Sequence, residues 1–293
     1  MVKVPIHTQK VIITIMLAFF TLLGNASGQT VVWAVADRPT SYILEGEDKG
    51  KGAVDEVYAL LQENLTEYQH KNQEMTFARI IKQMEHGKNV CACGFKKPER
   101  EEVGIFSQPA IISVPFSIVT KKKHLPEMFN NVDSISLEKL LKNKSITCGV
   151  TQKRSYGSIT ELINIEQNKN ISVHTNTSNL TKMLLLDRVD YIIEIPSFPI
   201  YMAKQLKKED PLLNQNQDPL VSIGIEENTN KVLLASIFCT KNQWGNDIMK
   251  KIDDILSREK AKPQYLKMLE RWYDEKSRLV IRKHYNTEFI NAK

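Results

Sequence analysis

The chain has 293 residues, of which 25% are charged, and its formal net charge is +6. This length is enough for two modest lobes or one large domain. The surplus of Lys and Arg is mild and forms no dense stripe with interleaved aromatic residues, which argues against a nucleic-acid-binding protein.

The N-terminal segment has the pattern of a secretory signal peptide. A basic stretch precedes an apolar run over residues 11–23, which is about as long as a signal-peptide core and short for a bilayer span. The small residues Ala26 and Gly28 stand at the positions that favour cleavage. We therefore predict a signal peptide over residues 1–28 and an exported protein, with an uncleaved membrane anchor as the alternative.

The next part of the chain alternates strand and helix patterns. Residues 31–36 form an apolar run that predicts a buried strand, and residues 37–42 form the polar loop that leaves it. An amphipathic helix is expected over residues 53–61, and a second one over residues 75–86, ended by a glycine. A short strand over residues 89–93 follows. This alternation predicts a parallel α/β sheet.

The same order then recurs. Residues 146–150 predict a strand and residues 152–157 its exit loop. Helices are expected over residues 158–166 and 180–186, and another strand over residues 191–194. Two similar α/β lobes explain this repetition, although any α/β protein repeats helix, turn and strand.

Two apolar, extended stretches, residues 112–119 and 220–238, are interpreted as the connections between the lobes. The tail predicts helices over residues 244–258 and 263–276, the second with a proline at its start. The predicted division of the mature chain follows from these connections: residues 29–115 begin the first lobe, residues 116–225 form the second, and residues 226–293 return to the first.

Four cysteines are present: Cys91, Cys93, Cys148 and Cys239. Their spacing does not match a metal site, and no histidine cluster accompanies them. A disulfide is possible in an exported protein. We favour Cys91 with Cys239, because both follow apolar, strand-like runs that could be neighbours, while buried free thiols remain the alternative.

The order of these motifs resembles the family-3 periplasmic solute-binding proteins, the type II bilobed receptors of amino-acid importers. The resemblance covers nearly the whole mature chain. It rests on the following segments: residues 33–42, 52–55, 87–90, 98–100, 106–109, 188–191 and 263–272. It implies an α/β fold of two Rossmann-like lobes joined by a two-segment hinge, and a monomer in the periplasm. It also implies an amino-acid-like or other carboxylate ligand, an ABC permease as partner, and no cofactor or metal.

The resemblance also assigns roles to two charged residues. Arg100, in the acidic turn before the strand at Phe106, matches the arginine that grips the ligand carboxylate with its planar fork of donors. Glu194 matches the acid that holds the ligand ammonium. The alternatives are a surface ion pair of Arg100 with a neighbouring glutamate, and a salt bridge of Glu194 to an Arg or Lys within its lobe.

The loop after residue 151 departs from the family pattern. Most members carry a Gly-Thr pair that also binds the carboxylate, whereas Lys153 stands here in place of the glycine. Ser155 could supply the hydroxyl, and Arg154 adds a possible second anion clamp or points to solvent. This departure leaves room for an acidic or larger ligand.

Three further residues complete the predicted ligand site. Tyr42, at the exit of the first strand, is expected to stack on the apolar part of the ligand, and Asp37 and Ser107 to line the cleft. Trp33 is assigned to the core, and Trp272 to packing.

Two rival functions use the same scaffold. A sensory or accessory protein would present its closed form to a membrane receptor instead of a permease. An enzyme resembling the dehydratases among the relatives would use a cleft acid such as Glu194 as general acid or base. No Ser-His-Asp order, metal motif or phosphate loop in the sequence supports catalysis.

Overall fold

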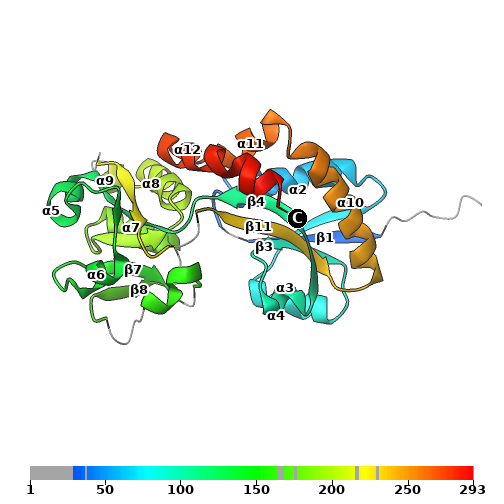
Figure 1. Ribbon diagram of the computed structural model, residues 1–293, viewed down its shortest axis with the longest axis horizontal. Helices are drawn as coiled ribbons and strands as arrows, with labels where there is room; N and C mark the ends of the chain where they lie inside the picture. The colour runs from blue at the N-terminus through cyan, green and yellow to red at the C-terminus, as the bar shows by residue number, and fades with distance from the viewer. Residues whose placement is uncertain are drawn as a thin grey trace, which may run out of the picture.

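The computed structural model describes residues 29–36, 38–152, 154–163, 168–174, 177–214, 218–228 and 231–292. They form two lobes joined by two extended segments (Figure 1). Each lobe has its own sheet, with strand order β2-β1-β3-β11-β4 in the first and β6-β10-β5-β9-β7-β8 in the second. Each sheet also has its own buried apolar cluster. The predicted fold class, α/β with two lobes and a two-segment connection, is therefore confirmed.

The first lobe combines an N-terminal α/β segment with the C-terminal part of the chain. Its strands are β1 (Thr30–Val35), β2 (Gln69–Glu74), β3 (Val90–Gly94), β4 (Gly104–Ser113) and β11 (Leu233–Thr240). Its helices are α2 (Ala53–Asn64), α3 (Phe77–Glu85), α4 (Pro98–Glu101), α10 (Gln243–Glu259), α11 (Pro263–Glu270) and α12 (Glu275–His284), followed by a π-helical turn (Tyr285–Ile290).

The second lobe is one continuous stretch of chain. Its strands are β5 (Ser117–Lys121), β6 (Ser134–Ile135), β7 (Cys148–Thr151), β8 (Ile171–His174), β9 (Tyr191–Glu194) and β10 (Leu220–Ile225). Its α-helices are α5 (Leu125–Phe129), α6 (Leu137–Lys142), α7 (Thr177–Leu185), α8 (Ser197–Glu209) and α9 (Pro211–Asn214), and short 3₁₀ turns lie at Lys122–His124 and Gly157–Leu162.

The expected parallel sheet is mixed in both lobes. In the first lobe β1 pairs in parallel with β2 and β3, whereas β11 runs antiparallel to both β3 and β4. The cause is the connectivity: β4 leads toward the second lobe and β11 returns from it, so these two neighbours run in opposite directions. In the second lobe β5 is likewise antiparallel to β9 and β10.

The C-terminal helix expected over residues 263–276 is two helices. Pro263 starts α11, as predicted, since proline lacks the N–H that the first helical position leaves unpaired. The chain then breaks at residues 271–274. Asp274 begins α12 by accepting a hydrogen bond from the backbone N–H of Ser277, which satisfies one of the free donors of the new helix. A local capping signal therefore ends the continuous helical pattern.

The lobe connections lie between β4 and β5 and between β10 and β11. The predicted domain boundaries, after residues 115 and 225, remain predictions. The predicted signal peptide over residues 1–28 lies outside the described residues. In the part of the chain that the structure covers, no helix is long and apolar enough to cross a membrane.

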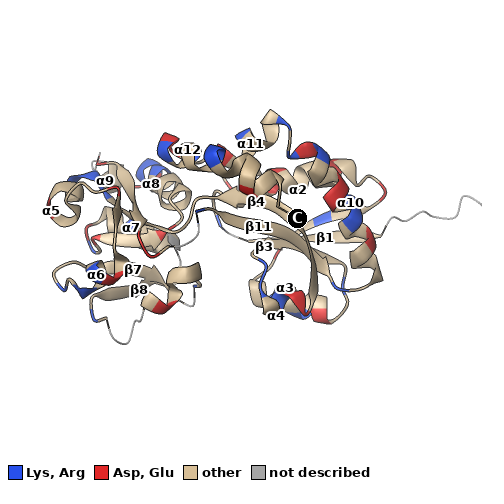
Figure 2. Ribbon diagram, viewed as in Figure 1, with Lys and Arg blue, Asp and Glu red and all other residues tan. Residues whose placement is uncertain are grey.

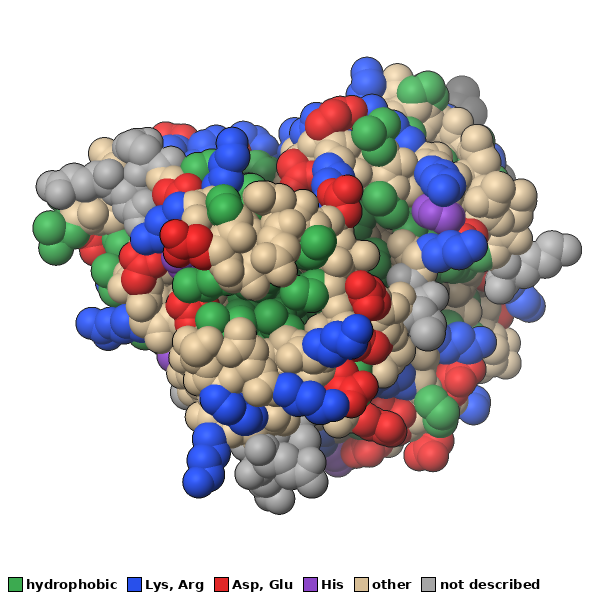
Figure 3. All heavy atoms as spheres, turned by 60° about the vertical axis from the view of Figure 1, so that its left-hand side comes forward, with side chains coloured by type: hydrophobic (Ala, Val, Ile, Leu, Met, Phe, Trp, Pro, Cys, Tyr) green, Lys and Arg blue, Asp and Glu red, His purple; other side chains and the backbone are tan. Residues whose placement is uncertain are grey.

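Lys and Arg alternate with Asp and Glu over both lobes (Figure 2), and the two signs also mix on the face drawn in Figure 3. Among the described residues, two ion pairs cross between the lobes. Lys208 of α8 lies 3.3 Å from Glu47, and Lys276 of α12 lies 2.8 Å from Asp133. These exposed pairs contribute little to stability individually, but they show that α8 and α12 contact the opposite lobe.

Candidate functional site

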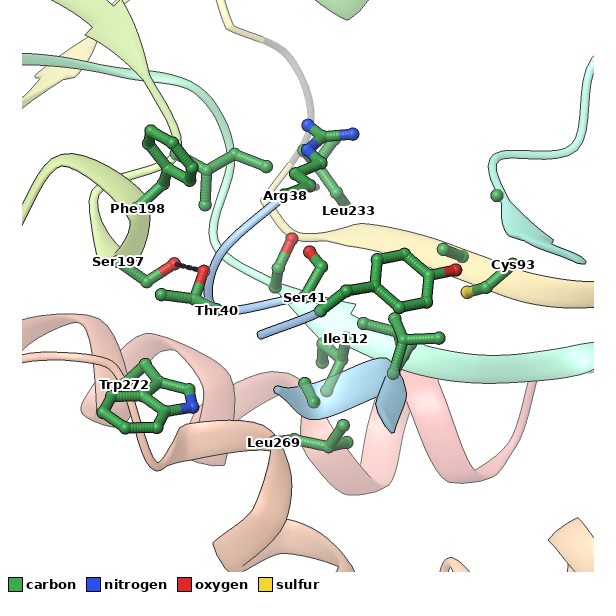
Figure 4. Close-up of a pocket in the computed structure, with 18 of the residues that line it drawn as sticks. Arg38, Thr40, Ser41, Cys93, Ile112, Ser197, Phe198, Leu233, Leu269 and Trp272 are labelled. Carbon is green, nitrogen blue, oxygen red and sulfur yellow. Dashed lines mark hydrogen bonds between the residues drawn. The ribbon is translucent and has the colours of Figure 1, made fainter. Parts of the chain in front are cut away.

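A cavity lies between the lobes, where the loop after β1 faces the end of β9. Its volume is about 180 Å³, well below the ~300–1,000 Å³ of pockets that hold drug-sized ligands. The first lobe contributes residues 38–42, the end of β3, Arg100 and parts of β4 and β11, and the second contributes Glu194, Ile195, Ser197 and Phe198. Figure 4 shows Thr40 of the first lobe beside Ser197 of the second, with Phe198 near them and Cys93 on the far side of the view. The cavity suits a small molecule.

Arg100 lines this cavity and is fixed by its own lobe. The short helix α4 presents it, its Nη1 donates to the carbonyl of Phe95 over 2.7 Å, and its Cζ lies 4.1 Å from the centre of the Phe77 ring. Burial lowers the pKa of Arg100, partly offset by the charge of Glu99. Its buried Nε has no hydrogen-bond partner among the described residues. Among the described residues, no acid neutralises the charge that Arg100 presents to the cavity.

The surface ion pair considered as the alternative for Arg100 is not formed with any described acid. Glu101 instead pairs with Lys96, at 3.1 Å between Nζ and Oε1. The Phe95 carbonyl and the Phe77 ring orient the Arg100 side chain toward the cavity. Neither group carries a negative charge that would neutralise the guanidinium.

Glu194 also lines the cavity, at the end of β9, and is paired within its lobe. Its Oε1 accepts hydrogen bonds from Arg154 Nη2 at 2.5 Å and from the backbone N–H of Ile195 at 2.7 Å. The side chain is only 1% exposed. Its Oε2 is buried and has no hydrogen-bond partner among the described residues. The salt bridge is the alternative that we considered for Glu194, and it leaves one acceptor oxygen unused.

Arg154 is built into the lobe and does not point freely to solvent. Its side chain is 14% exposed, and its Cζ lies 5.2 Å from the ring of Phe116 and 5.9 Å from that of Tyr156. These rings, together with the carboxylate of Glu194, hold the guanidinium beside Glu194, while Arg154 itself is not among the residues that line the cavity. The sequence named Arg154 and Glu194 separately, and the structure brings them together.

Tyr42 lies in the cavity wall and is mostly buried. Its hydroxyl is 3.3 Å from that of Tyr58, which donates to the carbonyl of Ala34, and the two rings meet edge to face. Burial raises the pKa of the Tyr42 hydroxyl well above its usual value, so the group stays neutral. Stacking of Tyr42 on a ligand remains a prediction.

Ser155, another predicted site residue, is not among the residues that line the cavity. Ser155 accepts a hydrogen bond from Lys97 Nζ at 3.3 Å, which joins the loop of the second lobe to the first lobe. Asp37 and Lys153 lie outside the described residues.

Ser107 is not among the residues that line this cavity. It is buried in β4, where its hydroxyl donates to the carbonyl of Gln108 and accepts from the N–H of Ile237. The pairing of β11 with β4 shifts register on both sides of Ser236, next to Ile237, whose N–H donates to the Ser107 hydroxyl.

The cysteines divide into a bonded pair and two thiols. The structure joins Cys91 of β3 to Cys239 of β11, the pair favoured from the sequence, which sit opposite each other on adjacent strands. Cys93 and Cys148 are free. Cys93 lines the cavity, and burial raises the pKa of its thiol to about 12, so it is protonated at neutral pH. Among the described residues, no group of His, Cys, Asp and Glu could hold a metal ion.

Several cavity residues were not identified from the sequence. Arg38 lies next to Asp37 in the exit loop of β1, and its charge interacts with those of Glu194 and Arg154. Thr40 and Ser197 face each other across the lobes, with 3.2 Å between their hydroxyl oxygens, as the dashed line in Figure 4 shows. Arg38 could have been predicted from the sequence, because it belongs to the loop over residues 37–42, which was already assigned to the cleft. Ser197 had none, since its role depends on how the lobes meet.

Trp272 was assigned to packing, and it also lines the cavity (Figure 4). Its Nε1 donates to the carbonyl of Lys51 over 2.8 Å, and its ring meets Tyr201 of α8 edge to face at 4.9 Å between centroids. This contact brings a C-terminal residue of the first lobe against a helix of the second.

Comparisons with known proteins agree with this architecture. The sequence profile of the bacterial extracellular solute-binding proteins, family 3, matches residues 30–275. No curated protein matches the sequence. Many solved structures share the fold.

Three of these structures illustrate the range. An ancestral arginine-binding protein bound to arginine is 19% identical, with a TM-score of 0.58, and the match covers 84% of this chain and 99% of that one. The substrate-binding protein of an amino acid ABC transporter is 18% identical over 83% of this chain and 99% of its own, with a TM-score of 0.54. A histidine kinase sensor domain similar to periplasmic binding proteins is 12% identical over 84% and 96%, with a TM-score of 0.59.

Proposed function

Because the chain belongs to the bacterial extracellular solute-binding proteins of family 3, we propose that it captures a small, carboxylate-bearing, amino-acid-like ligand by hinged closure of its lobes and delivers it to an ABC permease. The observation that supports this proposal is that Arg100 of the first lobe and Glu194 of the second line the same cavity. Its cellular location would be the periplasm.

Binding would begin on the first lobe. The guanidinium of Arg100 is held by the Phe95 carbonyl and the Phe77 ring, so it loses little side-chain freedom when a carboxylate arrives. Tyr42 would cover the apolar part of the ligand. A charge-assisted hydrogen bond contributes about 1.5–3 kcal/mol.

Closure would then bring the second lobe onto the same ligand. Glu194 and Ser197 lie on that lobe at the cavity, and Ser155 would approach from its loop. A ligand shifts an open–closed equilibrium only through its differential affinity for the closed form. Contacts made by both lobes on one ligand provide that difference, and the existing Thr40–Ser197 contact supports the direction of closure.

The test is a thermal-shift screen of the mature chain with amino acids, dicarboxylates, polyamines and short peptides, followed by calorimetry of each hit. We predict that Arg100→Ala weakens binding of the carboxylate ligand at least about tenfold, since about 1.4 kcal/mol corresponds to a factor of ten. Arg258→Ala, at an exposed position of α10, is the matched control and should leave the affinity unchanged. Equal affinity of Arg100→Ala and the parent protein would remove Arg100 from the site.

A sensory role is the second candidate, supported by the fold shared with a histidine kinase sensor domain. Both roles use the same cavity and the same closure. Uptake of labelled ligand by cells with and without the gene distinguishes them, because only an import protein makes uptake depend on it. Incubating the protein with the ligand and searching for a product tests the enzymatic alternative.

A further inference from the structure

The charge at the end of β9 is already neutralised by the protein. The carboxylate of Glu194 accepts a hydrogen bond from Arg154 Nη2 at 2.5 Å, and the guanidinium of Arg154 lies 5.2 Å from the ring of Phe116 and 5.9 Å from that of Tyr156. An ammonium group arriving at Glu194 would therefore meet a guanidinium as well as a carboxylate. The like charge cancels most of the attraction that an isolated acid would offer.

Glu194 nevertheless keeps one way to recognise a ligand. Its Oε1 is occupied by Arg154 and the N–H of Ile195, whereas Oε2 is buried and unpartnered among the described residues. A buried acceptor without a donor is costly, so a ligand hydroxyl that donates to Oε2 would be favoured. A hydroxyl supplies this hydrogen bond without bringing a positive charge next to Arg154.

The remaining charged groups of the cavity are cationic. Among the described residues that line it, the cations are Arg38 and Arg100 and the only acid is Glu194. Glu194 is already paired with Arg154. Neither Arg38 nor Arg100 forms an ion pair with a described acid. Two guanidinium groups from two segments of the first lobe suit two carboxylates on one small molecule.

We propose that this cleft selects a short 2-hydroxy dicarboxylate over the α-amino acid of the same shape, with Arg154 standing where the ligand ammonium would otherwise lie. This inference rests on the proposed capture of a small carboxylate ligand and names its class. The two carboxylates bind Arg38 and Arg100, and the 2-hydroxyl donates to Glu194.

The matched probes are L-malate and L-aspartate, which differ only by a hydroxyl in place of the ammonium, with 2-hydroxyglutarate and glutamate as the longer pair. Calorimetry on the parent protein should show the hydroxy acid of one pair binding at least about tenfold more tightly than its amino acid, the equivalent of losing one favourable charged contact. Succinate, which lacks the hydroxyl, should bind more weakly than malate.

Arg154→Met gives the decisive variant, because methionine keeps contact with the two rings and removes the positive charge. Glu194 then becomes an unpaired acid, and the preference should reverse so that the amino acid binds at least about tenfold more tightly than the hydroxy acid. Arg154→Lys retains the charge and should retain the preference for the hydroxy acid. It also keeps the test valid if the methionine variant does not fold. Arg258→Met is the control for a surface arginine.

The outcomes separate the two proposals. If the parent protein binds an amino acid more tightly than its hydroxy analogue, and Arg100→Ala abolishes that binding, capture of a carboxylate stands and the preference for a hydroxy acid is overturned. If both Arg154 variants keep the preference of the parent protein, Arg154 does not set it, and the inference also fails. If no carboxylate of any class binds the parent protein, the proposed function itself is overturned.

Discussion

The two lobes are stabilised in different ways. The first is closed by a disulfide between β3 and β11, and its core contains the fully buried rings of Trp33 and Tyr58. The second has no described disulfide. Its buried cation, Lys121, is 0% exposed and pairs with Asp187 at 2.8 Å, whereas the buried Lys260 of the first lobe, 2% exposed, donates only to uncharged oxygen atoms. Covalent closure restricts the unfolded chain, whereas a buried charge is stable only while its partner stays ionised. The first lobe should therefore be the half of the molecule that is more stable against unfolding.

The same contrast extends to the cavity. The first lobe supplies Arg100, whose contacts are a carbonyl and a ring, and so its charge remains available to a ligand. The second lobe supplies Glu194, whose charge is satisfied by Arg154. We therefore expect the first lobe to attract anions. The second lobe would then contact the bound ligand through its shape and its hydrogen-bonding groups.

The largest expected effect comes from breaking the disulfide. Replacing both Cys91 and Cys239 with serine should lower the free energy of unfolding of the first lobe by about 2–5 kcal/mol, the usual contribution of a native disulfide. All three tryptophans, Trp33, Trp244 and Trp272, lie in elements or turns of the first lobe, so their fluorescence during denaturation reports on that lobe.

Cys93→Ser is the control for this experiment, because Cys93 lies on the same strand as a free thiol. It should leave most of the stability in place. Equal destabilisation by the control and by the double variant would mean that the cross-link contributes nothing specific.

A smaller effect is expected in the second lobe from Asp187→Asn. This change removes the negative charge that faces Lys121 and Lys123, and it keeps a residue that tolerates the positive φ of 55° at this position. Because Asp187 is half exposed, the loss should be roughly 1–2 kcal/mol. This is below the cost of removing one partner from an ion pair in which both charges are buried. Hydrogen exchange of β5 measures it locally.

Glu138→Gln in α6 is the matched control, since it removes an exposed ion pair with Lys142 from the same lobe. Its effect should be a few tenths of a kcal/mol. Similar protection of β5 in both variants would contradict a special role for Asp187.

The pH dependence of the same pair sharpens this prediction. Loss of hydration acts to raise the pKa of Asp187, but hydrogen bonds from Lys121 and Lys123 outweigh it and the pKa is lowered. An acid with a lowered pKa in the folded state stabilises it above the unfolded pKa and loses this contribution as the pH falls through the folded value. The difference between the parent protein and Asp187→Asn should therefore disappear in acid.

The smallest expected effect concerns the contact between the lobes. Ser197→Ala removes the hydroxyl that faces Thr40 across the cavity. One neutral hydrogen bond contributes about 0.5–1.5 kcal/mol, so the ligand-free protein should shift toward the open form without unfolding. Small-angle scattering should show a larger radius of gyration. An unchanged radius together with unchanged ligand affinity would mean that this contact does not bias closure.

Much of the fold could be predicted from the sequence, because local patterns determined it. The apolar run around Trp33 gave β1, and Pro263 marked the start of α11. β2 was not identified, since Gln69–Glu74 is entirely polar and has no alternation of apolar residues. It is a strand only because it pairs with β1 at the edge of the sheet, and an edge strand can face water.

The sequence named some of the residues that meet at the cavity but not their contacts, and the roles of these residues in ligand binding stay predictions. Arg100, Tyr42 and Glu194 all line the cavity. The pairing of Glu194 with Arg154 joins residues 40 positions apart and depends on the fold of the whole lobe. Ser107 shows the opposite case, since a polar residue in a suitable segment directs its hydroxyl into the sheet.

The bond between Cys91 and Cys239 spans 148 positions of sequence, and the entire second lobe lies inside that span. The lobe is thus a loop of a covalent ring. A protease that cuts once anywhere in it produces two fragments that stay attached until a reductant is added. The disulfide itself can form only after the ribosome has completed the second lobe, because Cys239 follows that lobe in the sequence.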